Sequence, residues 1–252
     1  MSDPVQFIAD LLNGTSDEMA FAMELLEMYP RYYAGDVRSL IFDMRNQSVV
    51  SSSLSSIPHL MTEKIYTDLI GKVQRGQRQY YYTTVERYAM ENGHAQELAN
   101  MLIALDDERL NRKGFIIASR FYQDWGQEVL ENALEHGTDG QVKLVFGILL
   151  RRLEADALRS NNTVGVEQFV TNFYNSSPVY RQMWVVERLE LVEQSPQWVK
   201  NLFAQFCTSK AEEIRDLGFQ KLHGMQTKDD WAVELMKQGI MDSNSDISEL
   251  CF

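Results

Sequence analysis

The chain has 252 residues, of which 44% are hydrophobic and 24% are charged, and its formal net charge at pH 7 is −12. This composition is typical of a folded globular protein and argues against an intrinsically disordered chain. The negative charge disfavours binding to DNA or RNA, because affinity for nucleic acid comes largely from neutralising phosphates with Lys and Arg.

Apolar residues recur at helical spacing along most of the chain, while proline and Asn-Gly turn signals are scarce, which predicts an all-α fold. Helices are expected in the N-terminal half over residues 4–13, 17–29, 32–44, 48–58, 61–74, 77–91, 95–105 and 108–122. In the C-terminal half they are expected over residues 125–136, 140–153, 166–174, 179–192, 196–207, 211–225 and 229–241. Residues 155–163 are predicted to form a protruding loop, and residues 242–252 a frayed, flexible tail.

The two cysteines, Cys207 and Cys251, are far apart in the sequence, and neither belongs to a Cys-x-x-Cys pair. No spacing of Cys, His or Glu predicts a metal site, so we expect no metal and no cofactor. The N-terminal residues lack the basic start and apolar core of a signal peptide, and no run of about 18 apolar residues predicts a membrane span. The sequence therefore predicts a cytoplasmic protein that does not enter the membrane.

A short pattern returns about every 30 to 40 residues: a polar turn, then an arginine, then the start of an apolar stripe. Examples are Asp107–Phe115, Ser177–Trp184 and Ser209–Phe219. Self-similarity at a fixed period is typical of stacked repeat proteins, whose helix pairs bury their apolar faces against their neighbours. The sequence therefore predicts helices that pair and stack.

Two of these segments resemble the entry into the second helix of HEAT and armadillo-type repeats. Asp107 is followed by Arg112 and Gly114, and Ile214-Arg215 is followed by Gly218. The resemblance covers nearly the whole chain and implies a right-handed α-solenoid of about seven helix pairs, in a single domain over residues 1–241. It also implies that the second helices line a concave face.

The second helices align at one position, occupied by Arg78, Arg112, Val142, Arg181 and Arg215. One hypothesis is a structural ladder, in which each arginine bonds to a turn acid or to backbone carbonyl groups and sets the stacking register. The other is a basic stripe that is exposed for binding. A mutation of Arg112 and Arg215 separates the two, because only the ladder predicts a loss of stability.

The segment Lys72–Tyr82 places three basic residues before three consecutive tyrosines, in an otherwise acidic protein. Neighbouring residues on a helix point about 100° apart, so at least one of these tyrosines is expected to be exposed. Exposed tyrosine beside arginine is typical of interface hot spots and of base-stacking platforms. The residues predicted to bind a partner are Arg75, Arg78, Tyr80, Tyr81, Arg112 and Arg181.

Three tryptophans, Trp125, Trp198 and Trp231, each lie near the start of a predicted first helix. They are interpreted as packing between repeats, or alternatively as the lining of a groove. Trp125 with Glu128 and Trp231 with Glu234 resemble the exposed tryptophan and nearby carboxylate of HEAT-like DNA-alkylation-repair enzymes, but both pairs also fit the pattern of an ordinary helix surface.

No catalytic motif is recognised, so the chain is not expected to be an enzyme. The predicted function is a non-catalytic scaffold or adaptor that binds a protein segment on the concave face of the array. One alternative is a HEAT-like nucleic-acid-binding or DNA-repair-type protein, which requires a continuous basic stripe. Another is an acidic inhibitor or immunity-type protein that blocks a basic partner.

Overall fold

The computed structural model describes residues 4–28, 63–75, 78–192, 195–225 and 230–252, and every regular element in these residues is a helix. The prediction of an all-α fold is therefore confirmed for this part of the chain. The chain divides into two compact units, unit 1 (residues 1–126) and unit 2 (residues 127–252). The helices predicted over residues 32–44 and 48–58 lie outside the described residues, and a single continuous array over 1–241 remains a prediction.

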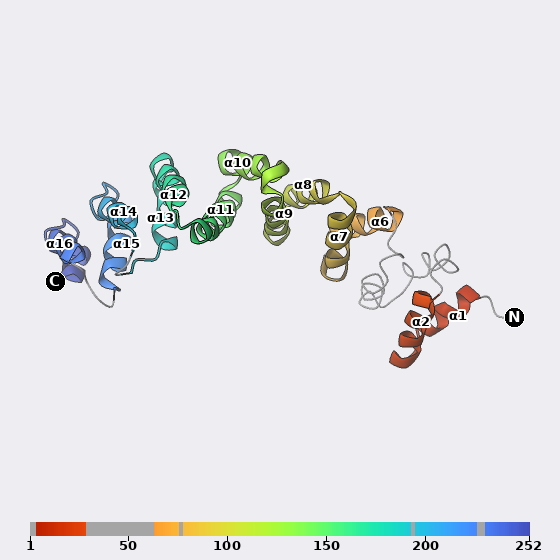
Figure 1. Cartoon of the computed structure of the whole chain (residues 1–252). Helices are drawn as coiled ribbons and strands as arrows, with labels where there is room; N and C mark the ends of the chain where they lie inside the picture. The colour runs from red at the N-terminus through yellow and green to blue at the C-terminus, as the bar shows by residue number, and fades with distance from the viewer. Residues whose placement is uncertain (1–3, 29–62, 76–77, 193–194, 226–229) are drawn as a thin grey trace. The chain divides into compact units, whose positions relative to one another are not determined.

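In unit 1 the described helices are α1 (Pro4–Leu12), α2 (Ser16–Met28), α6 (Glu63–Gln74), α7 (Arg78–Asn92), α8 (Ala95–Ala104) and α9 (Glu108–Arg120), followed by a short π-helical turn, η2 (Tyr122–Gly126). Helix α1 packs on α2, and α6, α7, α8 and α9 each pack on the next helix in the chain (Figure 1). Local residues explain where α7 ends and where α9 begins. Gly93 follows α7 with φ of +82°, a conformation that glycine adopts without strain, and the Asp107 carboxylate caps α9 by accepting from the Leu110 N–H.

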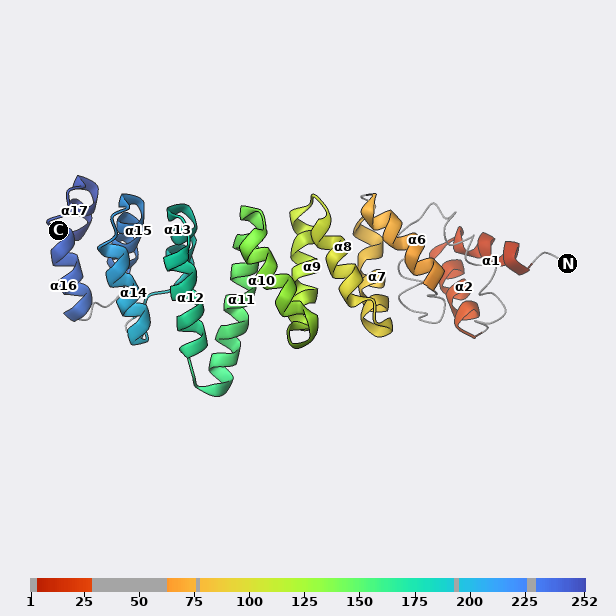
Figure 2. The same cartoon turned by 90° about the horizontal axis from the view of Figure 1, so that it is seen from above.

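In unit 2 the helices are α10 (Gln127–His136), α11 (Asp139–Ser160), α12 (Val164–Ser176), α13 (Val179–Arg188), α14 (Gln197–Cys207), α15 (Glu212–His223), α16 (Asp230–Gly239) and α17 (Ser245–Cys251). Consecutive helices form pairs such as α10 with α11, α12 with α13, and α14 with α15 (Figure 2). The pairs also contact one another, because α12 packs on α14, α14 on α16, α13 on α15, and α15 on α17.

The second helices share a buried position at their seventh residue. This position is held by Thr84, Gly114, Val145, Val185, Gly218 and Cys251, all of which are buried. The eighth residue is buried as well in five of these second helices, α7, α9, α11, α13 and α15, where it is Val85, Phe115, Phe146, Val186 and Phe219. A recurring buried position is what a repeated packing arrangement produces.

The predicted loop over residues 155–163 is wrong over most of its length. Helix α11 continues to Ser160, and only residues 161–163 separate it from α12 (Figure 2). The segment Leu153–Arg159 consists of Leu, Glu, Ala, Asp and Arg, which are compatible with helix or strongly favour it. Asn161 then ends the helix in the left-handed conformation, with φ of 52°.

The predicted flexible tail also differs from the structure. Residues 245–251 form α17, which packs on α15 and α16. Asn244 caps the helix by accepting from the N–H groups of Asp246 and Ile247, while Ile247 and Cys251 are buried in the core of the last helices. The polar composition of this segment concealed two apolar residues four positions apart, which is the spacing of one helical face.

Candidate functional site

The structure gives the six predicted binding residues different surroundings. Arg75 is exposed directly after α6, and its guanidinium group lies back over Gly71. Arg112 is exposed on α9 and has no ion-pair partner among the described residues. Arg78, Tyr80 and Tyr81 belong to α7, but their side chains lie outside what the structure describes. Arg181 lines a cavity in unit 2.

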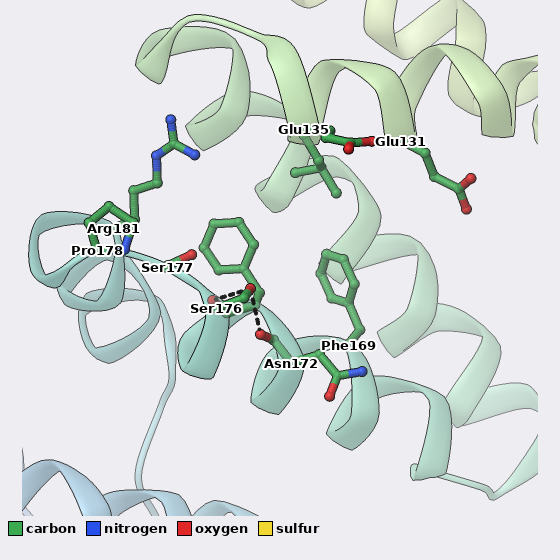
Figure 3. A pocket seen from close by; sticks show the side chains of 10 residues that line it. Glu131, Glu135, Phe169, Asn172, Ser176, Ser177, Pro178 and Arg181 are labelled. Atoms are coloured by element: carbon green, nitrogen blue, oxygen red, sulfur yellow. Dashed lines mark hydrogen bonds between the residues drawn. The ribbon is translucent and has the colours of Figure 1, made fainter.

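This cavity is a groove of about 470 Å³ between α10 and α12 in unit 2. Figure 3 shows the Phe169 ring pointing from α12 toward α10, where Glu131 and Glu135 lie along the opposite wall. At the end near Arg181, the groove is lined by Ser176, the last residue of α12, and by Ser177 and Pro178 in the turn before α13. The groove therefore opens between the first helices of two successive pairs.

The floor of the groove is aromatic. Phe169 and Phe173 are half-buried on α12, one helical turn apart, and both stack on the buried Phe146 of α11 with centroid distances of 5.5 and 4.4 Å. Leu134 adds an apolar side chain from α10. These rings are held by their packing on α11, so the floor is preformed rather than assembled on binding.

The rim of the groove is polar and open to solvent. The residues Glu131, Glu135, Asn172, Ser176 and Pro178 are all exposed. The Glu131 carboxylate accepts one bond from Gln127, at 2.7 Å, while the Glu135 carboxylate is 3.7 Å from the His136 ring. Both carboxylates keep free lone pairs toward solvent, since a carboxylate accepts up to about four hydrogen bonds.

Arg181, at the end of the groove, is held by the Asp139 carboxylate at the start of α11. Its Nε and Nη2 atoms donate to Asp139 Oδ1 at 3.1 and 2.7 Å, and the Tyr180 hydroxyl donates to the same oxygen at 3.0 Å. These bonds, led by those from Arg181, lower the pKa of Asp139 and raise that of Arg181. The positive charge of Arg181 is therefore largely compensated within unit 2.

A smaller cavity of about 270 Å³ occupies the corresponding place between α14 and α16. Trp231 lines it, with the Lys200 ammonium 5.3 Å from the ring centroid. Trp125 and Trp198 are half-buried and pack against hydrophobic cores, as the packing interpretation predicted. Trp231 packs against the core and also lines a cavity, so it agrees with both the packing interpretation and the groove interpretation.

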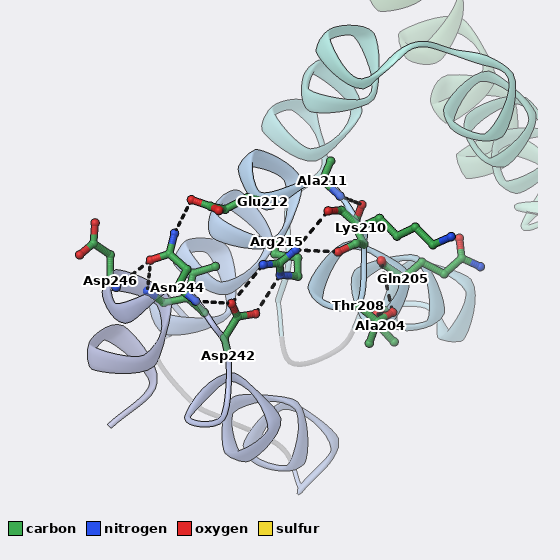
Figure 4. Close-up of polar contacts among 12 residues, drawn as sticks. Ala204, Gln205, Thr208, Lys210, Ala211, Glu212, Arg215, Asp242, Asn244 and Asp246 are labelled. Atoms are coloured by element: carbon green, nitrogen blue, oxygen red, sulfur yellow. Dashed lines mark hydrogen bonds and ion pairs between the residues drawn. The ribbon is translucent and has the colours of Figure 1, made fainter.

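The arginine series divides into residues with different roles. Arg215 on α15 donates to both oxygens of Asp242, at 2.8 and 3.1 Å, and to the Ser209 carbonyl at 3.0 Å (Figure 4). Both side chains are nearly buried, and the hydrogen bonds between them lower the pKa of Asp242 and raise that of Arg215. This arginine fits the ladder hypothesis, whereas the exposed Arg112 does not.

The helix boundaries reveal a different register from the one that the arginines suggest. At the fourth residue of four second helices, a polar side chain bonds to a carbonyl group at or near the end of the preceding helix. These pairs are Asn111 with Leu102, Ile103 and Leu105, Gln182 with Tyr174, Arg215 with Ser209, and Ser248 with Ile240. Arg112 is the fifth residue of α9, and Arg181 is the third residue of α13. The predicted alignment of the arginines is therefore wrong by one residue at Arg112 and by one residue at Arg181.

Sequence reasoning missed the groove residues themselves. Phe169 and Phe173 have the spacing of an ordinary core stripe, and Glu131 and Glu135 have that of a solvated helix face. One signal was present, because α10 and α12 together contain four glutamates and neither lysine nor arginine. This charge pattern alone does not predict a groove, because the sequence does not show that α12 lies beside α10.

The described residues contain no group of three or more Cys, His, Asp or Glu side chains arranged to hold a metal ion. Both cysteines are buried, and burial raises the pKa of the Cys207 thiol to about 12. A protonated thiol is a poor nucleophile, so Cys207 is unreactive in this state. None of the helices in the described ranges has the length and hydrophobicity needed to cross a bilayer.

What the groove offers is therefore a place for an apolar side chain beside carboxylates. Comparison with known proteins adds no family to this description: no protein-family model matches the chain, and no curated protein matches it significantly.

Proposed function

We propose that the protein is a non-catalytic, protein-binding helical-repeat module, and that the groove between α10 and α12 receives a segment of its partner. The observation that carries the proposal is the combination of a preformed phenylalanine floor with an exposed polar rim. A buried apolar anchor surrounded by polar rim contacts is the usual anatomy of a protein interface.

The openness of the rim favours a protein segment over a small molecule. A small-molecule site buries about 70–90% of the surface of its ligand, and a few polar groups of the site point toward the ligand. Here the rim residues Glu131, Glu135, Asn172 and Ser176 are exposed, so a bound molecule would keep one side in solvent. A peptide segment suits this shape, because it can insert one side chain and continue along the surface.

We further propose that the helix pairs belong to a right-handed, HEAT-like array of about seven pairs. The recurring buried seventh residue and the recurring bond from the fourth residue support a common repeat unit. The sequence resemblance places binding on the second helices. The groove instead favours the first helices of unit 2, with Arg181 as the shared residue.

The groove can be blocked without disturbing the core, because its rim residue Asn172 is exposed. The variant Asn172→Trp places a large side chain over the groove. Asn175→Trp is the matched control, since Asn175 is also an exposed asparagine on α12 but does not line the groove. A phage library of short protein segments is selected on the wild-type protein and then tested on both variants.

The proposal predicts a set of segments that bind the wild type and Asn175→Trp but not Asn172→Trp. Circular dichroism and thermal melting establish that both variants remain folded. If every selected segment binds the two variants alike, the groove is not the binding site and the proposal fails.

A further inference from the structure

The two helices that form the walls of the groove carry acidic residues without a lysine or an arginine of their own. Helices α10 and α12 contain Glu128, Glu131, Glu135 and Glu167, and neither helix contains a lysine or an arginine. The nearest described cation in the lining, Arg181, is paired with Asp139 at 2.7 Å. The carboxylates at the groove are therefore not compensated by basic residues of the two helices that form its walls.

We infer that the groove selects a basic amphipathic protein segment, in which one large apolar side chain enters between Phe169 and Phe173 and flanking Lys or Arg side chains pair with Glu131 and Glu135. This inference rests on the proposed function and adds the chemistry of the partner. The apolar side chain supplies affinity by leaving water on the phenylalanine floor. The carboxylates select the sign of the flanking charges.

The separation of the two rim carboxylates defines the spacing of the partner's basic residues. Glu131 and Glu135 are four residues apart on α10, which corresponds to a rise of about 6 Å along the helix axis. A helical partner matches this with basic residues at positions i and i+4. An extended partner matches it at i and i+2, since each strand residue advances about 3.3 Å.

Glu128 extends the same acidic face of α10, because residues at i, i+3 and i+7 lie on one side of a helix. The face thus continues for about 10 Å along the axis. Because Glu128, Glu131 and Glu135 are exposed, each contributes modestly to affinity, while together they attract a basic segment and repel an acidic one.

The inference is tested by the composition of the segments recovered with the phage library. Segments whose binding is lost in Asn172→Trp are sequenced and compared with the unselected library. The inference predicts a clear excess of Lys and Arg on both sides of a Leu, Phe, Trp or Met residue. Groove-dependent segments without excess positive charge would overturn the inference and leave the proposed function intact, whereas recovery of no groove-dependent segment would remove both.

The carboxylates are then tested directly with the strongest of these segments, synthesised with a fluorescent label. The double variant Glu131→Gln/Glu135→Gln is expected to bind it about three- to tenfold more weakly than the wild type at low salt. The control Glu154→Gln/Glu190→Gln removes the same charge from exposed positions that do not line the groove. Equal weakening in the two double variants would show that only net charge matters and would contradict the pairing.

Discussion

Arg215 and Asp242 are 27 residues apart and form a two-pronged ion pair that joins α15 to the turn before α17, with distances of 2.8 and 3.1 Å. The same arginine donates to the Ser209 carbonyl in the turn before its own helix. One side chain therefore connects two successive turns, which is the role that the ladder hypothesis assigns to the repeat arginines.

Replacement of Arg215 by Gln is expected to lower the free energy of unfolding by about 1.5–3 kcal/mol, because it leaves the nearly buried Asp242 carboxylate without its charged donor. Urea unfolding followed by circular dichroism measures the change. Arg112→Gln is the control and is expected to change stability by less than about 0.5 kcal/mol, because Arg112 is exposed. Equal losses in the two variants would contradict the distinction.

The Arg215–Asp242 pair also predicts a dependence on pH. Arg215 holds the pKa of Asp242 below its ordinary value, which is about 3.9 in an unfolded chain. The stabilisation is therefore fully present above about pH 4 and is lost as the pH falls through the lowered pKa of the folded state. The difference in unfolding free energy between wild type and Asp242→Asn is expected to be largest near neutral pH and to shrink in acid. A difference that grows in acid would have the wrong sign.

Asn111 is expected to be the most sensitive polar residue of unit 1. Its buried side-chain amide donates toward the carbonyl groups of Leu102, Ile103 and Leu105, at 3.1, 3.0 and 2.8 Å, and so satisfies the end of α8. Asn111→Ala is expected to cost about 1–3 kcal/mol, and Asn111→Asp more, because a carboxylate cannot donate to carbonyl oxygens. Thermal melting compares them with Asn100→Ala, an exposed asparagine on α8 that is expected to be nearly neutral.

Gly114 and Gly147 form a matched pair on second helices. A Cβ atom at Gly114 would lie 2.8 Å from the Ala99 carbonyl oxygen and 2.7 Å from the Ile103 side chain, whereas a Cβ atom at Gly147 would meet nothing within 4 Å. Gly114→Ala is therefore expected to destabilise the protein despite the better helix propensity of alanine. Gly147→Ala is expected to stabilise it by up to about 1 kcal/mol. Equal effects, measured by urea unfolding, would show that α8 and α9 do not pack this closely.

Apart from α17, the α-helices of the described residues were predictable because each carries an apolar stripe at helical spacing, and most boundaries agree within a few residues. The alignment of the repeats with one another was harder to predict. Arginine is conspicuous in the sequence, but the feature that recurs is the fourth position of a second helix, whatever residue occupies it. In α9, α13, α15 and α17 that position holds Asn111, Gln182, Arg215 and Ser248, four side chains that share only the ability to donate a hydrogen bond to a carbonyl group. In α11 the same position holds the apolar Val142. No single residue type marks it.

The groove was not predictable for a different reason. Phe169 and Phe173 are separated from Glu131 and Glu135 by the whole of α11, and they come together only because the fold places α12 across the groove from α10. Arg181, one of the residues predicted to bind a partner, lines this groove, and its role in binding stays a prediction. In the structure its charge is paired with Asp139, and its contribution is to close one end of the groove.

The most direct test of the central claim is to map where a groove-dependent segment binds. The segment is synthesised with a photoreactive group next to its apolar anchor, crosslinked to the wild-type protein, and the attachment sites are identified by mass spectrometry. Binding in the groove predicts crosslinks to α10 and α12, within residues 131–135 and 169–178. Crosslinks confined to the second helices, such as α13 at Tyr180 and Trp184, would contradict it.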